Sequence, residues 1–398
     1  MTEQLRSLHV NETRLRERLE TLASLARTPE GIYRLAYSDA FHRSNAYIAS
    51  LMKEAGMEVR TNAVGNTVGV LPGKSSRTIL AGSHIDSVRD AGMFDGCLGV
   101  IAGIEVAQVL YENGIVPEHT LEVAAFADEE GLVAGGMLGS CAYCGLSPSP
   151  DHVAAMETLG ISREDYDAAR APVTPDWALE LHIEQGGVLE HRQKDIGIVT
   201  AIVAIRRYLV EFSGTANHAG TTPMELRDDA LIKAARFVQR VREVVMETHA
   251  EMVGTVGRLE VSPGSENTVP GRVRLTLELR SQQEAHVETA YRTLMEEFRD
   301  DIAACRLTLY QGSFPMDKTI RETVAAVCEE KGLSAMEMGS GAGHDSMILA
   351  QVTRTGMIFV PSINGISHSP AERTHWKDVR QGADVLLQTL LLLDSMAE

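Results

Sequence analysis

Apolar and polar residues follow two patterns along the chain, and the first is typical of buried strands and helices. Residues 78–83 and 121–127 are short, continuous apolar runs that predict strands, and residues 98–111 between them predict a helix. Because these strands are continuously apolar, both faces of their sheet should be covered. The pattern returns after residue 316, with a helix over 320–332, a strand over 356–361 and a closing helix over 377–395. It predicts an α/β fold with a mixed sheet covered by helices.

The second pattern starts at about residue 205 and predicts a small antiparallel sheet. Residues 208–212, 256–261 and 273–279 alternate apolar and polar side chains, as strands with one face in solvent do. Residues 223–249 predict a helix, and its apolar stripe consists of Leu231, Ala234, Val238, Val241 and Val245. We therefore expect a catalytic domain of residues 1–204 and 318–398, interrupted by an inserted α+β domain of residues 205–317.

Charge and cysteine content narrow the possible functions. With 37 Lys plus Arg against 55 Asp plus Glu, the formal net charge of −18 should repel nucleic acid and anionic membranes. No apolar run is long enough to cross a bilayer, and the charged N-terminal segment lacks the apolar core of a secretory signal. Five irregularly spaced cysteines do not form a disulfide framework in a chain of this size. These features predict a cytoplasmic protein with reduced thiols and no nucleic-acid or membrane partner.

Candidate metal-binding residues directly follow the predicted strands. His84 ends the first strand, Asp86 could orient its imidazole, and Asp95 in a Gly-flanked loop could bridge two cations. Glu129 and Glu130 follow the next strand, and their side chains should point in opposite directions, one to a metal and one to a water as general base. Taken singly, such residues are more often solvated loop residues. Their shared position at strand ends favours a site.

Two further histidines complete the candidate ligand set. His182 in LELHIEQGGVLE and His368 in SINGISHSPAER each lie near a glycine and an apolar stretch. With His84, Asp95 and Glu130 they supply five nitrogen and oxygen ligands. Such a set suits two divalent ions, Zn²⁺ or Mn²⁺ or Co²⁺, and does not suit a soft thiolate site.

Seven motifs occur in a fixed order along most of the chain: HxD, FDG, DEEG, LHIEQG, NHAGTTPM, SGAGHDS and NGISHSPAE. Together they resemble the N-carbamoyl-L-amino acid hydrolase and allantoate amidohydrolase branch of the M20 metallopeptidase clan. The resemblance implies an aminopeptidase-like catalytic domain with a dinuclear metal centre, and an inserted lid that also forms a homodimer.

The resemblance also implies a role for each candidate residue. His84 and His182 would bind one ion, Glu130 and His368 the other, and Asp95 would bridge the two. Glu129 would be the base that takes a proton from a water held by both ions and returns it to the leaving nitrogen.

Further residues match substrate contacts of that family. His218 matches a histidine that reaches across the dimer to stabilise the tetrahedral oxyanion, while Asn267 and Arg280 match lid residues that bind a carboxylate. Gln185 and His344 match additional substrate contacts. Without the resemblance, His218 would be an ordinary loop histidine, Asn267 a turn residue and Arg280 a solvated strand end.

The implied substrate is a small ureido or amide compound that carries a carboxylate. An N-carbamoyl-L-amino acid would give the amino acid, ammonia and carbon dioxide. Allantoate carries the same two groups and is the alternative, and FVPSINGISHSPAERT is most similar to the allantoate enzymes.

The chain departs from the family pattern after Gly131. Residues 132–136 (LVAGG) lack the arginine usual there, and the segment is one residue shorter than in the family. This departure favours a bulkier or less polar substrate, so an N-acyl amino acid amidase or a peptidase is a further alternative. A binding protein without activity is the remaining class, and the retained ligands and base argue against it.

Overall fold

The computed structural model describes residues 3–396. The chain divides into two compact units, one of residues 1–200 and 316–398 and one of residues 201–315. The expected domain boundaries, after residues 204 and 317, lie a few residues from these divisions.

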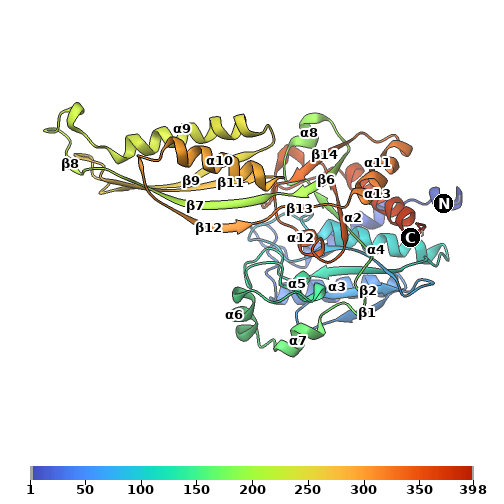
Figure 1. Cartoon of the computed structure of the whole chain (residues 1–398). Helices are drawn as coiled ribbons and strands as arrows, with labels where there is room; N and C mark the ends of the chain where they lie inside the picture. The colour runs from blue at the N-terminus through green and yellow to red at the C-terminus, as the bar shows by residue number, and fades with distance from the viewer. Residues whose placement is uncertain (1–2, 397–398) are drawn as a thin grey trace. The chain divides into compact units, whose positions relative to one another are not determined.

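A nine-stranded mixed sheet organises the first unit (Figure 1). Its strands lie in the order β1-β2-β4-β3-β5-β15-β6-β13, with β14 paired to β6. The pairs β4-β3, β3-β5 and β5-β15 are parallel, so the carboxyl ends of these four central strands lie at one edge. The strands are β1 (Glu58–Thr61), β2 (Thr67–Leu71), β3 (Thr78–His84), β4 (Thr120–Phe126), β5 (Trp177–Ile183), β6 (Ile196–Ile202), β13 (Phe314–Pro315), β14 (Ala335–Ser340) and β15 (Arg354–Val360).

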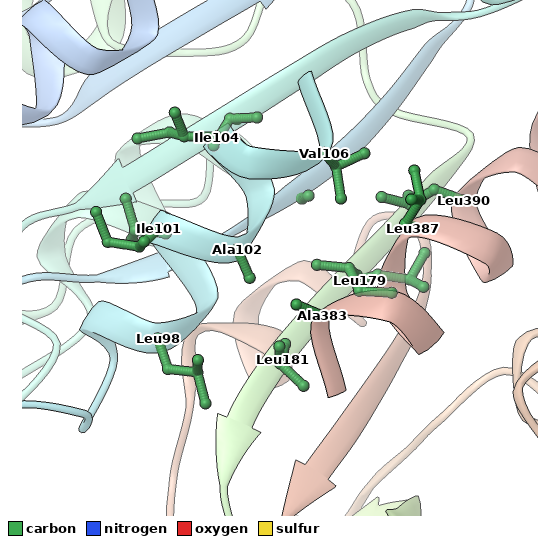
Figure 2. Close-up of a cluster of buried hydrophobic side chains, with 14 of the residues drawn as sticks. Leu98, Ile101, Ala102, Ile104, Val106, Leu179, Leu181, Ala383, Leu387 and Leu390 are labelled. Atoms are coloured by element: carbon green, nitrogen blue, oxygen red, sulfur yellow. The ribbon is translucent and has the colours of Figure 1, made fainter. Parts of the chain in front are cut away.

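Helices cover both faces of this sheet, which confirms the predicted α/β fold. The larger core contains α4, which is buried along almost its whole length because its sequence is apolar on all sides. Figure 2 shows Leu98 and Ala102 of α4 beside Leu181 of β5 and Ala383 of α13. A separate hydrophobic cluster, which includes Phe126, Tyr143 and Leu349, contains side chains from the other face of the sheet.

The helices of the first unit are α1 (Glu3–Arg6), α2 (Glu12–Ser24), α3 (Asp39–Glu54), α4 (Cys97–Glu112), α5 (Leu138–Cys144), α6 (Pro150–Leu159), α7 (Arg163–Ala168), α8 (Val188–Arg192), α11 (Lys318–Glu330), α12 (Asp345–Leu349) and α13 (Trp376–Asp394). A single 3₁₀ turn, η2 (Ile363–Gly365), precedes His368.

The second unit contains the predicted antiparallel sheet, in the order β12-β7-β11-β9. Its strands are β7 (Ala204–Ser213), β9 (Val253–Ser262), β11 (Arg272–Ser281) and β12 (Ile302–Gln311), and a short pair is formed by β8 (Asn217–His218) and β10 (Thr268–Val269). The helices α9 (Ala230–Thr248) and α10 (Glu284–Glu297) pack on one face. Burial alternates along β11, so the other face is more open, as the sequence pattern predicted.

The predicted helix over residues 223–249 is too long at its N-terminal end. Residues 224–226 form a 3₁₀ turn (η1), and α9 begins only at Ala230, where the Asp229 carboxylate accepts a hydrogen bond from the Leu231 amide at 2.9 Å. The buried stripe is centred on Phe237 and Val244, so Leu231 and Val238 lie at its edge rather than at its middle.

Within residues 3–396, every helix is too short or too polar to cross a membrane.

Candidate metal centre

The carboxyl-end edge of the central strands gathers the candidate ligands. His84 is the last residue of β3, His182 lies near the end of β5, and Glu129 and Glu130 follow β4. His368 lies in the loop after β15. These strands are neighbours in the sheet, so residues almost 300 positions apart in the sequence meet in one place.

Asp95 lies at the middle of the cluster. Its Oδ1 is 3.1 Å from His182 Nε2 and 3.6 Å from His84 Nε2, whereas its Oδ2 is 3.1 Å from His368 Nε2. His368 Nε2 is also 3.6 Å from Glu130 Oε2. The two oxygens of Asp95 therefore face two separate groups of side chains, as expected of a bridging carboxylate.

Both buried histidines present Nε2 toward Asp95. His84 Nδ1 is 3.1 Å from the carbonyl oxygen of Asp86, and His182 Nδ1 is 2.8 Å from the carbonyl oxygen of Ile183. Because a carbonyl only accepts, Nδ1 carries a proton in each ring, so the neutral form of each ring has its lone pair on Nε2. That is the tautomer in which a histidine binds a metal ion.

Asp86 contacts the site differently from the sequence-based expectation. Its carboxylate is 3.8 Å from His84 Nδ1, farther than its own carbonyl oxygen. The carboxylate instead accepts hydrogen bonds from the amides of Glu129 at 3.2 Å and Glu130 at 3.1 Å. Asp86 therefore holds the turn that carries both glutamates.

Burial perturbs the carboxylates of the cluster. Burial raises the pKa of Glu129 well above its usual value, and burial together with Asp95 raises the pKa of Glu130 to about 7. Burial acts in the same direction on Asp95, but the imidazoles of His182 and His368 outweigh it and hold its pKa well below the usual range.

The backbone at Gly96 packs so closely against His84 that only glycine fits at this position. A Cβ on Gly96, whose φ is +65°, would lie 2.4 Å from His84 Nε2. Gln185 and His368 also have positive φ values, 59° and 52°, although both carry side chains. Such strain in non-glycine residues is typical of functional sites.

Gln185 and His344 lie beside the candidate ligands. Gln185 Nε2 donates to Asp95 Oδ2 at 2.8 Å, and its buried Oε1 has no hydrogen-bond partner within residues 3–396. The His344 ring lies edge-on to that of His182 at 4.5 Å. Burial, and then the neighbouring His182, lower the pKa of His344 well below its usual value, so this ring is neutral.

A pocket of about 210 Å³ opens onto these groups. It is lined by His84, Asp95, Glu129, Glu130, Met137, Gln185, Ala342, Gly343, His344 and His368. The candidate base therefore shares one concave site with four of the five candidate ligands, all except His182.

The three remaining residues lie in the second unit, and two of them are close together. His218 pairs with Thr268 across the β8-β10 ladder, and the amide of Ala219 donates to the carbonyl of Asn267 at 2.8 Å. Arg280 lies near the far end of β11, where its Nε donates to Glu278 at 2.8 Å. Since β11 starts at Arg272, beside Ser213, about eight strand residues or roughly 26 Å separate the two ends.

Two buried glutamates support the cluster and were missed from the sequence. Glu372 accepts from the amides of Phe94 at 2.9 Å and Asp95 at 3.3 Å. Glu180 accepts from the hydroxyls of Ser83 at 2.6 Å and Ser346 at 2.7 Å. The one available signal for Glu180 was a charged residue two positions before the candidate ligand His182, in the mostly apolar segment WALELHI.

The donor set fits divalent metal ions. His84, Asp95 and His182 each offer a ligand atom within 4.8 Å of the others, and so do Asp95, Glu130 and His368. Imidazole nitrogens and carboxylate oxygens suit Zn²⁺, Mn²⁺ and Co²⁺. A third group, Glu180 with His182 and His344, fits less well because both Glu180 oxygens already accept hydrogen bonds.

Comparison with known proteins agrees with this geometry. Residues 80–392 match the family described as Peptidase family M20/M25/M40. An N-carbamoyl-L-amino-acid amidohydrolase from Paenarthrobacter aurescens is 38% identical over 96% of this chain and 98% of its own length. The allantoate amidohydrolase of Escherichia coli is 36% identical over 95% of this chain and 97% of its own.

A solved structure shares the whole fold. The hydantoinase/carbamoylase family amidase from Burkholderia multivorans has a TM-score of 0.89 and 32% identity, and the match covers 98% of this chain and 100% of that one. The chain therefore belongs to the metal-dependent M20/M25/M40 peptidase family, within its hydantoinase/carbamoylase amidase branch.

Proposed function

We propose that this protein hydrolyses N-carbamoyl-L-amino acids to the free amino acid, ammonia and carbon dioxide. The observation that carries the proposal is the buried Glu129, which shares a pocket with His84, Asp95, Glu130 and His368. Three amidohydrolases of N-carbamoyl-L-amino acids are 34–38% identical to this chain, over 95–97% of its length. Free thiols at all five cysteines suit a cytoplasmic location.

The proposed cofactors are two divalent ions. His84 and His182 would hold one, Glu130 and His368 the other, and Asp95 both. Such ions polarise a carbonyl oxygen and lower the pKa of a bound water.

Glu129 moves the proton of the reaction. Its carboxylate, 3.6 Å from His84 Nε2 and fixed through its amide by Asp86, accepts a proton from the attacking water. The water oxygen forms a bond to the carbamoyl carbon, and the bond from that carbon to the amino-acid nitrogen breaks. Glu129 gives its proton to the departing nitrogen, and the carbamate product decomposes to ammonia and carbon dioxide.

Buried groups near Glu129 have complementary tasks. The unpartnered Oε1 of Gln185 is an acceptor for a ureido N–H. His344, which is neutral, can donate or accept without adding charge beside the substrate.

We further propose that the working enzyme is a homodimer with shared sites. Within one subunit, roughly 26 Å of β11 separates Arg280 from Arg272, the end of the strand that follows the β8-β10 pair beside His218 and Asn267. Two subunits could supply the two groups to one site, with His218 stabilising the oxyanion and Arg280 binding the carboxylate.

Subunit complementation tests the shared site. Glu129→Ala and His218→Ala subunits are each expected to be inactive, whereas mixing them should restore activity because some heterodimers regain one intact site. Proven subunit exchange without restored activity would contradict the shared site.

Allantoate is the second candidate substrate, because the Escherichia coli relative with that activity covers nearly the whole chain. The deciding experiment measures ammonia and amine release from N-carbamoyl-L-amino acids, allantoate and N-acetyl-L-amino acids, with Glu129→Ala as the blank. Glu129-dependent ammonia from the carbamoyl series supports the proposal. Ammonia from allantoate alone selects the second candidate, and amine release from the acetyl series without ammonia would indicate an N-acyl amidase.

A further inference from the structure

One wall of the pocket is apolar, in contrast to the ligand side. Apart from the polar residues, the pocket is lined only by Met137, Ala342 and Gly343 within the described part of the chain. Met137 is the only large apolar side chain among them. A Cβ at Gly343 would lie 3.4 Å from Met137 Cε, so the methionine methyl group lies against the 342–343 backbone.

The backbone fixes the position of Met137. Met137 has a φ of 63° and directly precedes α5. The loop before it is held at two points: the Asp128 carboxylate accepts from the amides of Val133 at 3.2 Å and Ala134 at 2.9 Å, and His152 Nε2 is 2.8 Å from the Gly136 carbonyl. The wall is therefore built into the fold, although the thioether itself can adjust to its neighbours.

Met137 directly follows residues 132–136, where the chain departs from the family pattern, whereas Ala342 and Gly343 belong to the SGAGHDS motif. A thioether is at best a weak hydrogen-bond acceptor, so a polar group placed against it loses hydrogen bonds to water without replacement. A second ureido group, as in allantoate, would suffer this loss. An aliphatic side chain would instead bury apolar surface against Met137.

From these contacts we propose that Met137 determines specificity by receiving the side chain of an N-carbamoyl-L-amino acid, and that this side chain is apolar. The inference rests on the proposed function, because it presumes a ureido substrate. The rest of the pocket lining is polar and includes the unpartnered Oε1 of Gln185, so an apolar substituent on the α-carbon meets apolar surface only at this wall.

The first test uses the parent protein with its metal restored. Values of kcat/KM are measured for N-carbamoyl-glycine, N-carbamoyl-L-alanine, N-carbamoyl-L-methionine, N-carbamoyl-L-leucine and allantoate. We expect the methionine and leucine compounds to exceed the glycine compound by about tenfold or more, the range in which a hydrophobic pocket discriminates side chains. Preference for glycine or for allantoate would overturn the inference.

The second test changes the wall itself. Met137→Gln keeps the length of the side chain and makes it polar, and it should lower the methionine-to-glycine ratio of kcat/KM by about tenfold while raising the relative rate on allantoate. Met137→Ala should reduce the same ratio by a smaller factor. Thermal melting of each variant checks that it folds.

Met347→Ala is the matched control. Met347 is half-buried in the same hydrophobic cluster, and its sulfur would lie 3.6 Å from a Cβ at Gly343, but it does not line the pocket. Its removal should leave the ratio unchanged. Equal ratios in the parent and both Met137 variants would overturn the role of Met137, whereas absence of ammonia from every ureido substrate would overturn the proposed function itself.

Discussion

The two units of the chain treat charged side chains in opposite ways. In the first unit, Asp95 and Glu129 are buried among histidines at the ends of strands. In the second, Arg207 and Arg280 both bind Glu278 on the more open face of an antiparallel sheet. Exposed ion pairs change the free energy of folding little. A buried carboxylate, in contrast, destabilises the fold unless a cation or a proton neutralises its charge. The comparison shows that burial, rather than the number of charges, marks the functional region.

The largest effect on activity is expected for a substitution of the buried Glu129. Glu129→Gln keeps the shape and removes the charge, and kcat should fall by about 10³-fold, within the range contributed by general acid–base catalysis. Metal content, measured by elemental analysis, should stay at the parent level. Glu122→Gln is the control, because Glu122 is equally buried on β4 but binds Arg60 and Tyr143 instead. A loss below tenfold for Glu129→Gln would rule it out as the base.

Metal removal should destabilise the first unit and leave the stability of the second unchanged. A ligand present at a thousand times its Kd stabilises the folded state by about 4 kcal/mol, so chelation should destabilise the first unit by roughly that amount. Hydrogen exchange should speed up at the ends of β3 and β5 and stay unchanged in β7 and β11. Equal acceleration in both units would show that the buried cluster is not where the metal acts.

The candidate ligands could be predicted from the sequence, whereas the hydrogen bonds that hold them in place could not. His84, Glu129 and Glu130 follow apolar strands, so the local pattern alone placed them at a sheet edge. Glu372 differs: it ends the NGISHSPAE motif, but its hydrogen bond to the Phe94 amide spans 278 residues, and the motif does not show which group it binds. Only the folded chain shows that the Asp86 carboxylate binds backbone amides and that its carbonyl binds His84.

The arrangement of the second unit also could not be predicted from the sequence. His218 lies in the NHAGTTPM motif and Arg280 at the end of a predicted strand, but only strand pairing shows that His218 belongs to the short β8-β10 pair and Arg280 to β11. The start of α9 depended on which of several polar residues caps the helix, and Asp229 does so. Such choices are set by tertiary packing rather than by local pattern.

A half-buried arginine of the second unit, Arg280, should give a smaller and more selective effect. Arg280→Lys removes the two-pronged contact with a carboxylate, so KM should rise by about tenfold with little change in kcat. Arg274→Lys is the matched control, since Arg274 lies on the same strand and face and binds Glu211. Similar changes in KM for both variants would mean that Arg280 has no specific role.

The smallest expected effect concerns the pH dependence of stability. Burial raises the pKa of Asp345 from 3.8 to about 8. Between these pH values the folded state keeps a proton that the unfolded state has lost, so the free energy of unfolding of the metal-free protein falls as pH rises, by at most about 1.4 kcal/mol per pH unit.

Asp345→Asn should flatten this slope in urea unfolding measured at pH 5, 6, 7 and 8. Asp300→Asn, at an exposed position of the second unit, should leave it as in the parent. An unchanged slope in Asp345→Asn would show that this carboxyl group is ionised throughout.

The pairing of β5 with β15 has a consequence for biosynthesis. All strand pairings of the β7-β9-β11-β12 sheet lie within residues 204–311, so that sheet can form as soon as these residues leave the ribosome. The edge of β5 that pairs with β15 stays unpaired until residues 354–360 have been translated, and His368 is translated after them. Until then the nascent chain carries an open apolar strand edge, a site for mispairing. All five candidate ligands can therefore be present together only after residue 368 has been translated.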